Sequence, residues 1–465
     1  RKTNGQKGIT LVALVITIII LLILATISIQ SLTNTGLFAK AKEAKEKSQN
    51  AEENQEKTLN EYEDELNKYI SGTKQETDWT GKVNKPKLMT GMTAIRFNEP
   101  TGDEKANEGS TIKTTDTDTA WYDYDAKKWA NAQTQDGSMW VWIPRFAYRV
   151  NKSTQTFDVV FLEGTTDYYY ENGEKKEAKR QKTENETIDT TTGYTVHPAF
   201  TNESSINYAN GGWDKELTGI WVAKFEASNS GGKIKVEPGV QSWRSITVND
   251  IYTNCLNYNK TLNSHMMKND EWGAVAYLSK SKYGKQNEEV WINNSSSYIT
   301  GSAGNSASAS QDTGTTTDYT STQGVKASTT GTVYGVYDMS GGAWEYVAGY
   351  VNNGDSNLTS YGSSLVNGDA KTKNVYSKGS SDSRDNNYSA NSGKYGDAVY
   401  ETSANGNSSS SSWYGDCSNF PYTSGPFFER GGNYNNGTGA GVFYFSNSNG
   451  ISYGGDSFRP VLVTL

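Results

Sequence analysis

An uncharged run at the N-terminus, Ile9 to Ile29, is the strongest single constraint on how this chain can fold. It reads ITLVALVITIIILLILATISI and carries no charged side chain over 21 residues. A helix needs about 20 such residues to cross a bilayer. Arg1, Lys2 and Lys7 precede the run, which predicts that this end lies on the cytoplasmic side. We therefore expect a transmembrane helix. The alternative is a cleaved signal peptide, which has a shorter apolar run followed by a small-residue cleavage site.

The next segment, Ala39 to Ile70, is rich in Ala, Glu and Lys, and its apolar residues recur at helical spacing. These residues are Leu59, Tyr62, Leu66, Tyr69 and Ile70. Ser71 and Gly72 end the pattern. We expect one long helix over residues 9–72, embedded in the membrane first and amphipathic later. At 1.5 Å per residue its second half would extend about 45 Å.

Charge and composition exclude several classes of function. The net charge is −8, so a nucleic-acid partner has no electrostatic support. Only 34% of the residues are hydrophobic, but there are 30 Tyr and 12 Trp. These side chains can build a core while their polar ends reach a hydrogen bond. The many uncharged polar and Tyr residues suit an extracellular bacterial protein better than a cytosolic enzyme.

Cysteine and histidine are scarce. Cys255 and Cys417 either form one disulfide or stay as two free thiols. No CxxC pair marks a zinc or redox site. His197 and His265 stand in separate contexts, whereas nucleophilic catalysis needs a base beside its nucleophile. We expect structural hydrogen bonds from both histidines.

The middle of the chain has strand-like runs followed by two long polar segments. Aromatic and β-branched residues alternate with others in three runs, Met139–Val150, Thr156–Leu162 and Gly219–Ala227. Asn269 can cap a helix that carries Trp272 and Val275. Residues 295–331 and 352–412 are mostly Ser, Thr, Gly and Asn, which predicts long loops or insertions.

The last stretch, residues 430–465, mixes two kinds of residue. Arg430-Gly431-Gly432, Ala440 to Phe443 and Ser457 to Leu462 have the character of a framework. Tyr, Asn, Ser and Asp residues stand between them. Tyr supplies a stiff contact area and Asn or Ser supplies adaptable hydrogen bonds, as in recognition loops. Ordinary turn residues in a polar tail are the alternative.

The N-terminus resembles that of type IV pilin-like proteins. Lys7-Gly8 followed by Ile9-Thr10-Leu11-Val12 is similar to the family's cleavage site. The resemblance implies that a prepilin peptidase cuts between Gly8 and Ile9 and that Ile9 becomes a methylated first residue. It also implies other pilin-like subunits as partners. The family usually has Glu at the fifth mature position, where this chain has Ala13. A plain membrane anchor with a stalk is the alternative.

A second resemblance covers residues 139–465. Gly335 to Ala348 is similar to the Gly-Asp-Met-x-Gly-Asn-Val-Trp-Glu-Trp signature of formylglycine-generating (sulfatase-modifying factor) proteins, with Gly342 in place of Asn and Tyr346 in place of the second Trp. Other landmarks of the family follow in order: Phe146 in a first strand, Glu271-Trp272 within Met266 to Leu278, Arg430-Gly431-Gly432 and Ser457-Phe458-Arg459. The resemblance implies a C-type-lectin-like domain with loop insertions.

The resembled enzymes use two nearby cysteines that bind copper, because soft thiolates hold Cu(I). Cys417 stands alone near the end and Cys255 is distant. Histidine iron sites of related enzymes also lack their residues here. We therefore expect no enzyme activity, no catalytic residues and no cofactor. Trp344, Glu345 and Trp272 are expected to be structural. Asp and Asn clusters could hold a structural calcium, but no spacing marks a metal site.

Another group with this fold fits the C-terminus better. Phage receptor-binding proteins and other proteins diversified by retroelements end in a variable stretch on a framework that closes with a Phe-Arg strand. By this resemblance the ligand-binding residues would be Tyr434, Asn435, Asn436, Tyr444, Ser446, Asn447, Asn449, Ser452, Tyr453 and Asp456. Trp413 and Tyr414 would rim the same site. The ligand would be an extracellular protein or a glycan.

Taken together, the sequence predicts an α+β protein with a long N-terminal transmembrane helix followed by a C-type-lectin-like domain. The expected divisions are a leader at 1–8, a membrane and stalk helix at 9–72, a linker with accessory strands at 73–138 and the lectin-like domain at 139–465. The expected function is ligand binding at the bacterial cell surface, from the membrane or a pilus-like filament. A structural minor pilin and a formylglycine-generating-like oxidase are the alternatives.

Overall fold

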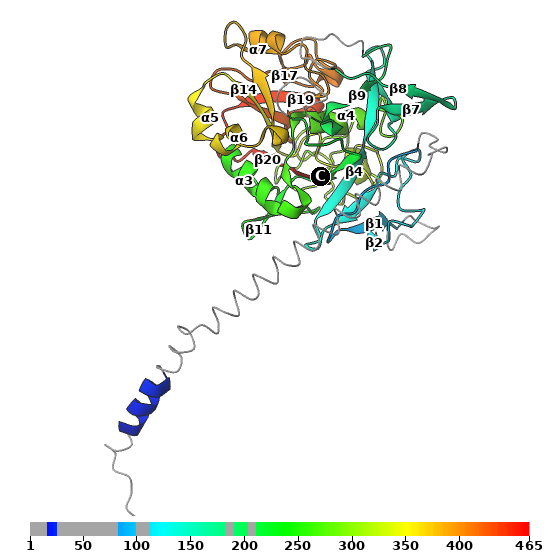
Figure 1. The fold of residues 1–465 in the computed structure, drawn as a ribbon. Helices are drawn as coiled ribbons and strands as arrows, with labels where there is room; N and C mark the ends of the chain where they lie inside the picture. The colour runs from blue at the N-terminus through cyan, green and yellow to red at the C-terminus, as the bar shows by residue number, and fades with distance from the viewer. Residues whose placement is uncertain (1–15, 26–81, 99–110, 182–189, 203–210, 465) are drawn as a thin grey trace, which may run out of the picture. The chain divides into compact units, whose positions relative to one another are not determined.

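The computed structural model of this chain describes residues 16–25, 82–98, 111–181, 190–202 and 211–464. The chain divides into two compact units, Arg1–Asp78 and Trp79–Leu465 (Figure 1). The described part of the first unit, residues 16–25, is a helix whose Ile and Leu side chains are exposed.

The expected α+β architecture with a long transmembrane helix is wrong. Among the described residues, no helix combines the length and the apolar character that crossing a membrane requires. Strands predominate in the second unit. The cleavage site at Gly8 and Ile9, the Ala13 position and the stalk lie outside the described residues.

The first of two large sheets collects strands from both ends of the second unit. Its strand order is β13-β21-β10-β4-β3-β1-β2, with antiparallel neighbours throughout. The strands are β1 (Thr93–Phe97), β2 (Thr111–Lys113), β3 (Asn131–Gln133), β4 (Met139–Pro144), β10 (Gly219–Ala223), β13 (His265–Met266) and β21 (Pro460–Leu462). The last strand of the chain therefore lies inside this sheet, between β13 and β10.

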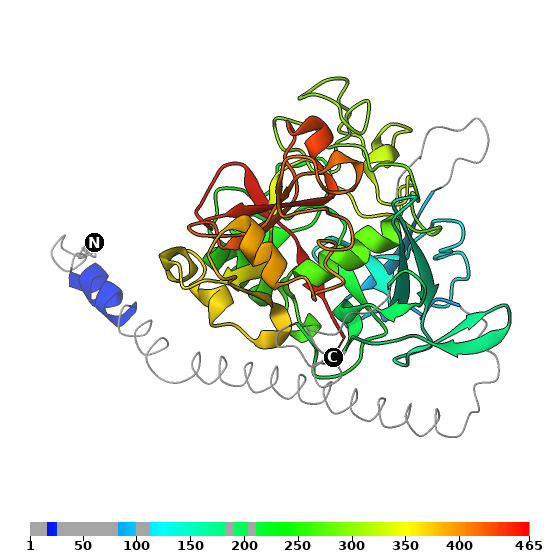
Figure 2. The same cartoon turned by 90° about the horizontal axis from the view of Figure 1, so that it is seen from above.

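The second large sheet comes from the C-terminal third of the chain. Its order is β15-β14-β18-β19-β17-β16, and β20 also pairs with β14. The strands are β14 (Trp344–Asn352), β15 (Asn374–Ser377), β16 (Asn407–Ser408), β17 (Ser418–Asn419), β18 (Phe427–Gly431), β19 (Gly441–Ser448) and β20 (Asp456–Phe458). Figures 1 and 2 show this sheet with the yellow and orange segments on one side of the unit and the cyan strands on the other.

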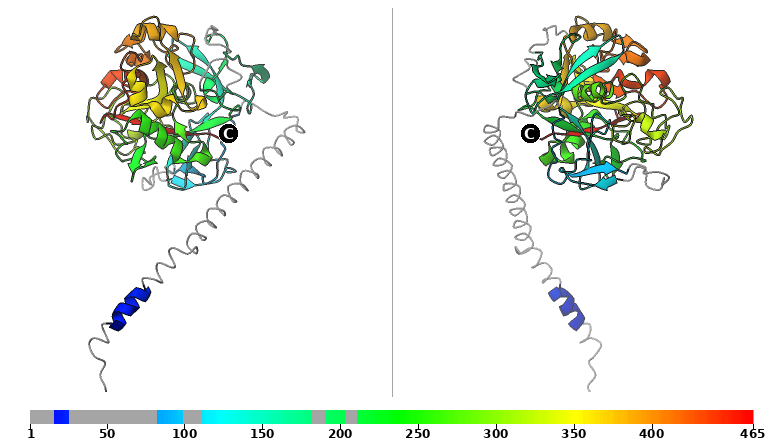
Figure 3. Two further views of the ribbon diagram at one scale, coloured as in Figure 1. Left: turned by 60° about the vertical axis from the view of Figure 1, so that its left-hand side comes forward. Right: turned by 90° about the vertical axis from the view of Figure 1, so that its right-hand side faces the viewer.

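Smaller elements complete the unit. A three-stranded sheet has the order β6-β5-β9, and two hairpins are separate. Figures 1 to 3 show one hairpin, β7–β8, projecting from the body. These strands are β5 (Phe146–Asn151), β6 (Thr156–Phe161), β7 (Tyr168–Glu171), β8 (Glu174–Glu177), β9 (Thr195–Val196), β11 (Ser228–Ser230) and β12 (Lys233–Lys235). The helices are α3 (Val248–Tyr258), α4 (Asn269–Ser279), α5 (Ser356–Ser360), α6 (Ser363–Val366) and α7 (Arg384–Ala390).

Helix α4 is the central helix, and all of its residues are buried. It begins at Asn269, so this residue is the first residue of the helix and not the cap that the sequence predicted; Lys268 holds the cap position. The Asn269 side chain instead accepts a hydrogen bond from Arg430 at 3.1 Å. Trp272 donates its indole N–H to the carbonyl of Val442 at 2.8 Å, which joins α4 to the second sheet.

Tryptophan builds much of the core, as composition predicted. Seven tryptophans are among the largest fully buried side chains: Trp121, Trp129, Trp140, Trp142, Trp213, Trp221 and Trp272. Their indole N–H groups reach backbone carbonyls where these are close. Trp129, for example, donates to Tyr283 at 2.8 Å and Trp221 to Lys87 at 2.7 Å. A chain with few aliphatic residues can therefore close its core with most of these donors paired, although the buried indole N–H of Trp142 has no hydrogen-bond partner among the described residues.

The predicted strands are present, with changed limits. Met139–Val150 becomes β4 and β5, because the backbone turns at Arg145, whose buried guanidinium pairs with Asp167 and Glu216. Thr156–Leu162 becomes β6. The Gly219–Ala227 run becomes β10, which is fully buried and lies between β4 and β21.

Arg459 joins the two large sheets. It lies between β20, which pairs with β14, and β21, which pairs with β10. Its guanidinium pairs with Glu345 of β14, with Nε and Oε2 at 2.7 Å. It also donates to the carbonyls of Ala223 at 3.1 Å and Tyr337 at 3.0 Å. Both partners of the ion pair are buried. The final arginine therefore binds one sheet through a carboxylate and the other through a carbonyl.

We predict that Arg459→Leu destabilises the unit strongly. The variant leaves Glu345 buried without its cation, and breaking such a pair typically costs about 3–5 kcal/mol. Denaturant unfolding of the variant and of the exposed control Lys233→Met measures this free energy. A loss below about 1 kcal/mol for Arg459→Leu, equal to that of the control, would contradict the role assigned to the pair.

Candidate ligand-binding face

The central strands of the second sheet separate their side chains onto two faces, because successive residues of a strand point in opposite directions. Cross-strand register puts Glu345 opposite Arg430, and Arg430 opposite Phe445. These three side chains are fully buried. The neighbouring positions occupy the other face. There Tyr346 lies opposite Glu429, and Trp344 lies opposite Asp456. This second face carries the candidate site.

Four polar side chains meet at the centre of this face, one from each of β14, β19, β18 and β20. Tyr346 and Ser448 hydrogen-bond through their hydroxyls at 2.7 Å. Asp456 hydrogen-bonds to Tyr346 and to Glu429, and Glu429 also bonds Ser448. We call these four residues the polar ring. Neither of its carboxyls forms a salt bridge with any described residue.

Burial without a cation shifts the protonation of both carboxyls. It raises the pKa of Asp456 to about 7. Burial and the neighbouring Asp456 together raise the pKa of Glu429 well above its ordinary value. A proton is therefore held within the pair near neutral pH, and the floor of the face carries little net charge.

A line of aromatic residues borders the polar ring. Trp344 and Tyr453 lie with ring centroids 6.4 Å apart. Tyr453 is 53% exposed, the highest value among the large hydrophobic side chains described in the second unit. Beyond it, Arg244 donates to the carbonyl of Gly454 and lies 3.9 Å over the ring of Tyr298.

The line ends at Tyr434, whose ring packs edge-on against Tyr298 at 4.9 Å. We call Tyr434, Tyr298, Arg244, Tyr453 and Trp344 the aromatic row, and the row together with the polar ring the binding face. Aromatic rings and a guanidinium held by their own neighbours offer contact area at low entropic cost.

The residues predicted to bind ligand divide into three groups. Tyr434, Asn435, Ser446, Ser452 and Tyr453 are exposed or half-buried on or beside the binding face. Tyr444 and Asp456 point to the same face but are only 6% and 2% exposed, so they belong to its floor. The asparagines of the third group have local roles in the backbone or on the opposite face.

In that third group, Asn436 accepts a hydrogen bond from the backbone of Asn433 at 2.7 Å, and Asn449 accepts one from Ile451 at 3.2 Å. Both side chains shape turns. Asn447 lies on the other face of β19 and accepts from Arg384 at 2.9 Å. The structure therefore does not bring these three amides together with the aromatic row.

Trp413 and Tyr414 do not rim this face. Trp413 packs against Phe443 with centroids 5.3 Å apart, and Tyr414 stacks on the same ring at 6.2 Å. Phe443 precedes Tyr444 in β19 and points to the opposite face. The expectation failed because sequence proximity to β19 does not tell on which side of the strand a neighbouring loop packs.

Six residues of the binding face were not predicted: Trp344, Tyr346, Glu429, Ser448, Arg244 and Tyr298. The alternation of Trp344, Glu345 and Tyr346 in one strand was a usable signal, since it sends Glu345 to one face and the aromatic residues to the other. Glu345 pairs with Arg459 on the buried face. Arg244 and Tyr298 come from distant loops and gave no local signal.

The cysteines and histidines lie elsewhere. Cys255 in α3 and Cys417 before β17 are buried free thiols. His265 lies 3.0 Å from the Glu271 carboxylate, and burial lowers the pKa of His197 to about 3. Over the described ranges, no three His, Cys, Asp or Glu residues are grouped to hold a metal ion.

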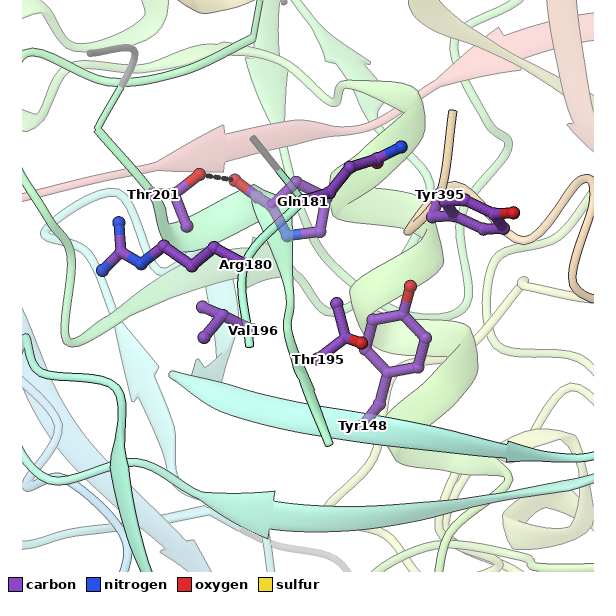
Figure 4. Close-up of a pocket in the computed structure, with 8 residues that line it drawn as sticks. Tyr148, Arg180, Gln181, Thr195, Val196, Thr201 and Tyr395 are labelled. Carbon is purple, nitrogen blue, oxygen red and sulfur yellow. Dashed lines mark hydrogen bonds between the residues drawn. The ribbon is translucent and has the colours of Figure 1, made fainter. Parts of the chain in front are cut away.

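A small cavity beside β9 is lined by Tyr148, Thr195 and Tyr395, among others (Figure 4). Its volume is about 10 Å³. That volume suits a single water molecule and excludes a larger ligand.

Comparisons with known proteins give no assignment: no protein-family model matches the chain, and a search of the curated proteins returned no match. The resemblances drawn from the sequence therefore remain predictions.

We predict that the polar ring makes stability depend on pH in a known direction. An unfolded aspartate titrates near pH 4, whereas the folded-state pKa of Asp456 is about 7. The folded state binds the proton more tightly, so this contribution to stability is complete below about pH 4 and is lost as pH rises toward 7. Asp456→Asn should reduce the slope of unfolding free energy against pH by up to about 1.4 kcal/mol per unit. If the slope for Asp456→Asn equals that of the unchanged protein and of the exposed control Asp125→Asn, the raised pKa assigned to Asp456 is wrong.

Proposed function

We propose that this protein is a ligand-binding module that recognises an extracellular protein or a glycan through the binding face. The observation that carries the proposal is the contrast between the two faces of one sheet. One face is sealed against α4 by Glu345, Arg430 and Phe445, while the other holds a row of partly exposed aromatic residues around a polar centre. Aromatic anchors held in place by a packed sheet are what a recognition surface needs.

The composition of the face supports both ligand classes. Tyrosine, tryptophan and arginine are the residues that dominate binding energy at protein interfaces. Ring faces beside hydroxyl and carboxyl groups also suit the apolar and polar sides of a sugar. Tyr434 at one end of the row and Tyr453 beside Trp344 near the other are exposed or half-buried, and they would serve as its anchors.

We propose binding and not catalysis for this chain. The two thiols occupy different elements, Cys255 in α3 and Cys417 beside β17, and both are buried. Burial raises the pKa of both thiols, Cys417 to about 11. A copper site like that of the resembled enzymes needs two thiolates side by side. This arrangement offers no support for one.

We also propose that the exposed positions of residues 430–465 are open to sequence change, in line with the resemblance to retroelement-diversified proteins. Arg430, Phe443, Phe458 and Arg459 are fully buried, while Asn435, Ser452 and Tyr453 are exposed. Exposed side chains can change with little effect on packing.

A ligand screen tests the proposed function. The purified chain is applied to a glycan array and to a phage-displayed peptide library, and the binders obtained are measured against variants. We predict that Tyr434→Ala with Tyr453→Ala weakens binding by roughly 2 kcal/mol or more, about 30-fold, because hot-spot aromatic residues contribute at this level. The matched control is Tyr168→Ala, an exposed tyrosine on the β7–β8 hairpin. Equal affinities for all three proteins would refute the proposal.

Stability measurements test the tolerance of the face. We predict that the triple change Asn435→Ser, Ser452→Asn and Tyr453→Ser alters the unfolding free energy by less than about 1 kcal/mol, because these side chains are exposed. Phe443→Ala should cost about 3–5 kcal/mol through loss of buried area and a cavity. A comparable loss in the triple variant would show that these residues support the fold.

A further inference from the structure

Asparagine followed by glycine is a reactive pair in proteins. The backbone nitrogen of the glycine can attack the side-chain carbonyl carbon of the asparagine and close a cyclic imide, and ammonia leaves. Glycine favours this step because it has no Cβ to crowd the attacking nitrogen. In the described part of the chain six such pairs occur, at Asn172, Asn353, Asn367, Asn405, Asn436 and Asn449. The structure decides which of them can react.

Four of the pairs are held by their asparagine side chains. Asn353, Asn405 and Asn449 each accept a hydrogen bond from the backbone N–H two residues ahead, at 3.0, 3.0 and 3.2 Å. Asn436 accepts one from the backbone N–H of Asn433 at 2.7 Å. In all four the side-chain carbonyl is bound to a neighbouring amide, so it must be released before it can be attacked.

A fifth pair, Asn367-Gly368, is held through its glycine. The amide of Gly368 donates to the carbonyl of Leu365 at 3.1 Å, so the attacking nitrogen is engaged. Gly368 is also closely packed, because an added Cβ would collide with the ring and hydroxyl of Tyr252. Rearrangement of the backbone at this pair would therefore disturb a buried contact with α3.

The sixth pair, Asn172-Gly173, has neither restraint. It forms the tip of the β7–β8 hairpin, with φ angles of 54° and 80°. Positive φ at both central residues is the type I′ turn, which joins two strands by two residues. Glu171 pairs with Glu174 across the turn. The amide of Gly173 and the exposed side chain of Asn172 make no hydrogen bond to any described residue.

The surroundings of this tip allow the turn to open. Attack on the side chain requires Asn172 to leave its left-handed conformation, so the turn must open first. Hairpin β7–β8 projects from the body (Figures 1 to 3), and three of the four residues of β8 are exposed. Exposed hairpin ends open locally at a small cost in free energy.

We propose that Asn172 is a self-modifying site of this protein. A bond forms between Cγ of Asn172 and the nitrogen of Gly173, and the bond between Cγ and Nδ2 breaks. Nδ2 leaves as ammonia with the proton of the Gly173 amide. Water then opens the imide at either carbonyl, which leaves aspartate or isoaspartate at position 172. No oxidant or reductant takes part.

The products change the tip in charge and in shape. A carboxylate at position 172 lies between Glu171 and Glu174 in the chain, so the tip gains a further negative charge at neutral pH. Aspartate tolerates the left-handed conformation and keeps the turn. Isoaspartate adds one carbon to the backbone, which the two-residue turn does not accommodate, so it loosens the pairing of β7 with β8.

Peptide mapping of the full chain by mass spectrometry tests the proposal. The folded protein is incubated in mildly alkaline buffer, which deprotonates the attacking amide more often, and the modified fraction is followed at all six pairs. Asn172 should react first, roughly fivefold or more ahead of the four side-chain-held pairs, because one intramolecular hydrogen bond reduces the share of released side chains by about that factor. The variant Asn172→Asp identifies the aspartate product by its elution.

The same incubation in denaturant is the matched control. Without the fold, all six pairs should react at similar rates, because each asparagine is followed by glycine. Selective reaction at Asn172 in the folded chain, lost in denaturant, supports the proposal. Absence of reaction at Asn172, slower reaction there than at the side-chain-held pairs, or a selectivity that denaturant leaves unchanged would overturn it.

Discussion

The buried ion pair between Arg459 and Glu345 is the interaction on which the rest of the second unit depends. The chain leaves one large sheet at β20 and enters the other at β21, and Arg459 is the residue where it crosses. Its guanidinium holds Glu345 in the second sheet and the carbonyl of Ala223 in the first. Burial raises the pKa of Glu345 to about 7 in spite of this pairing, so the pair lies in a strongly desolvating core.

The two faces of the second sheet therefore have different roles: one packs in the core and the other carries the binding face. Glu345 and Arg430 hold the inner face, while the outer positions of the same strands form the polar ring and the floor of the binding face. Trp344 and Tyr346 flank Glu345 in β14 and point outward, and Glu429 precedes Arg430 in the same way. A rigid inner face is what lets the outer side chains keep fixed positions for recognition.

Sequence reasoning predicted the parts that depend on local patterns. The strands β4, β6 and β10, the helix carrying Trp272, and the framework of Arg430, Phe443 and Arg459 follow from periodicity or from short motifs. The polar ring did not follow, because Glu429 and Asp456 meet only through strand register. Asn447 was assigned to the site by residue type, but the alternation of β19 turns it to the opposite face.

The N-terminal prediction is also overturned: among the described residues, no helix is long and apolar enough to cross a membrane. Residues 9–15 and 26–29 of the apolar run lie outside the described residues. The aromatic row was also beyond local patterns, because Arg244 and Tyr298 reach it from loops far apart in the chain.

Hydrogen–deuterium exchange of the full chain with and without a selected ligand tests the central claim most directly. The account predicts slower exchange at residues 433–436 and 449–456 and at the start of β14 when ligand is bound, with no change in the β7–β8 hairpin. Protection confined to other surfaces, with these segments exchanging as in the free protein, would contradict the assignment of the binding face.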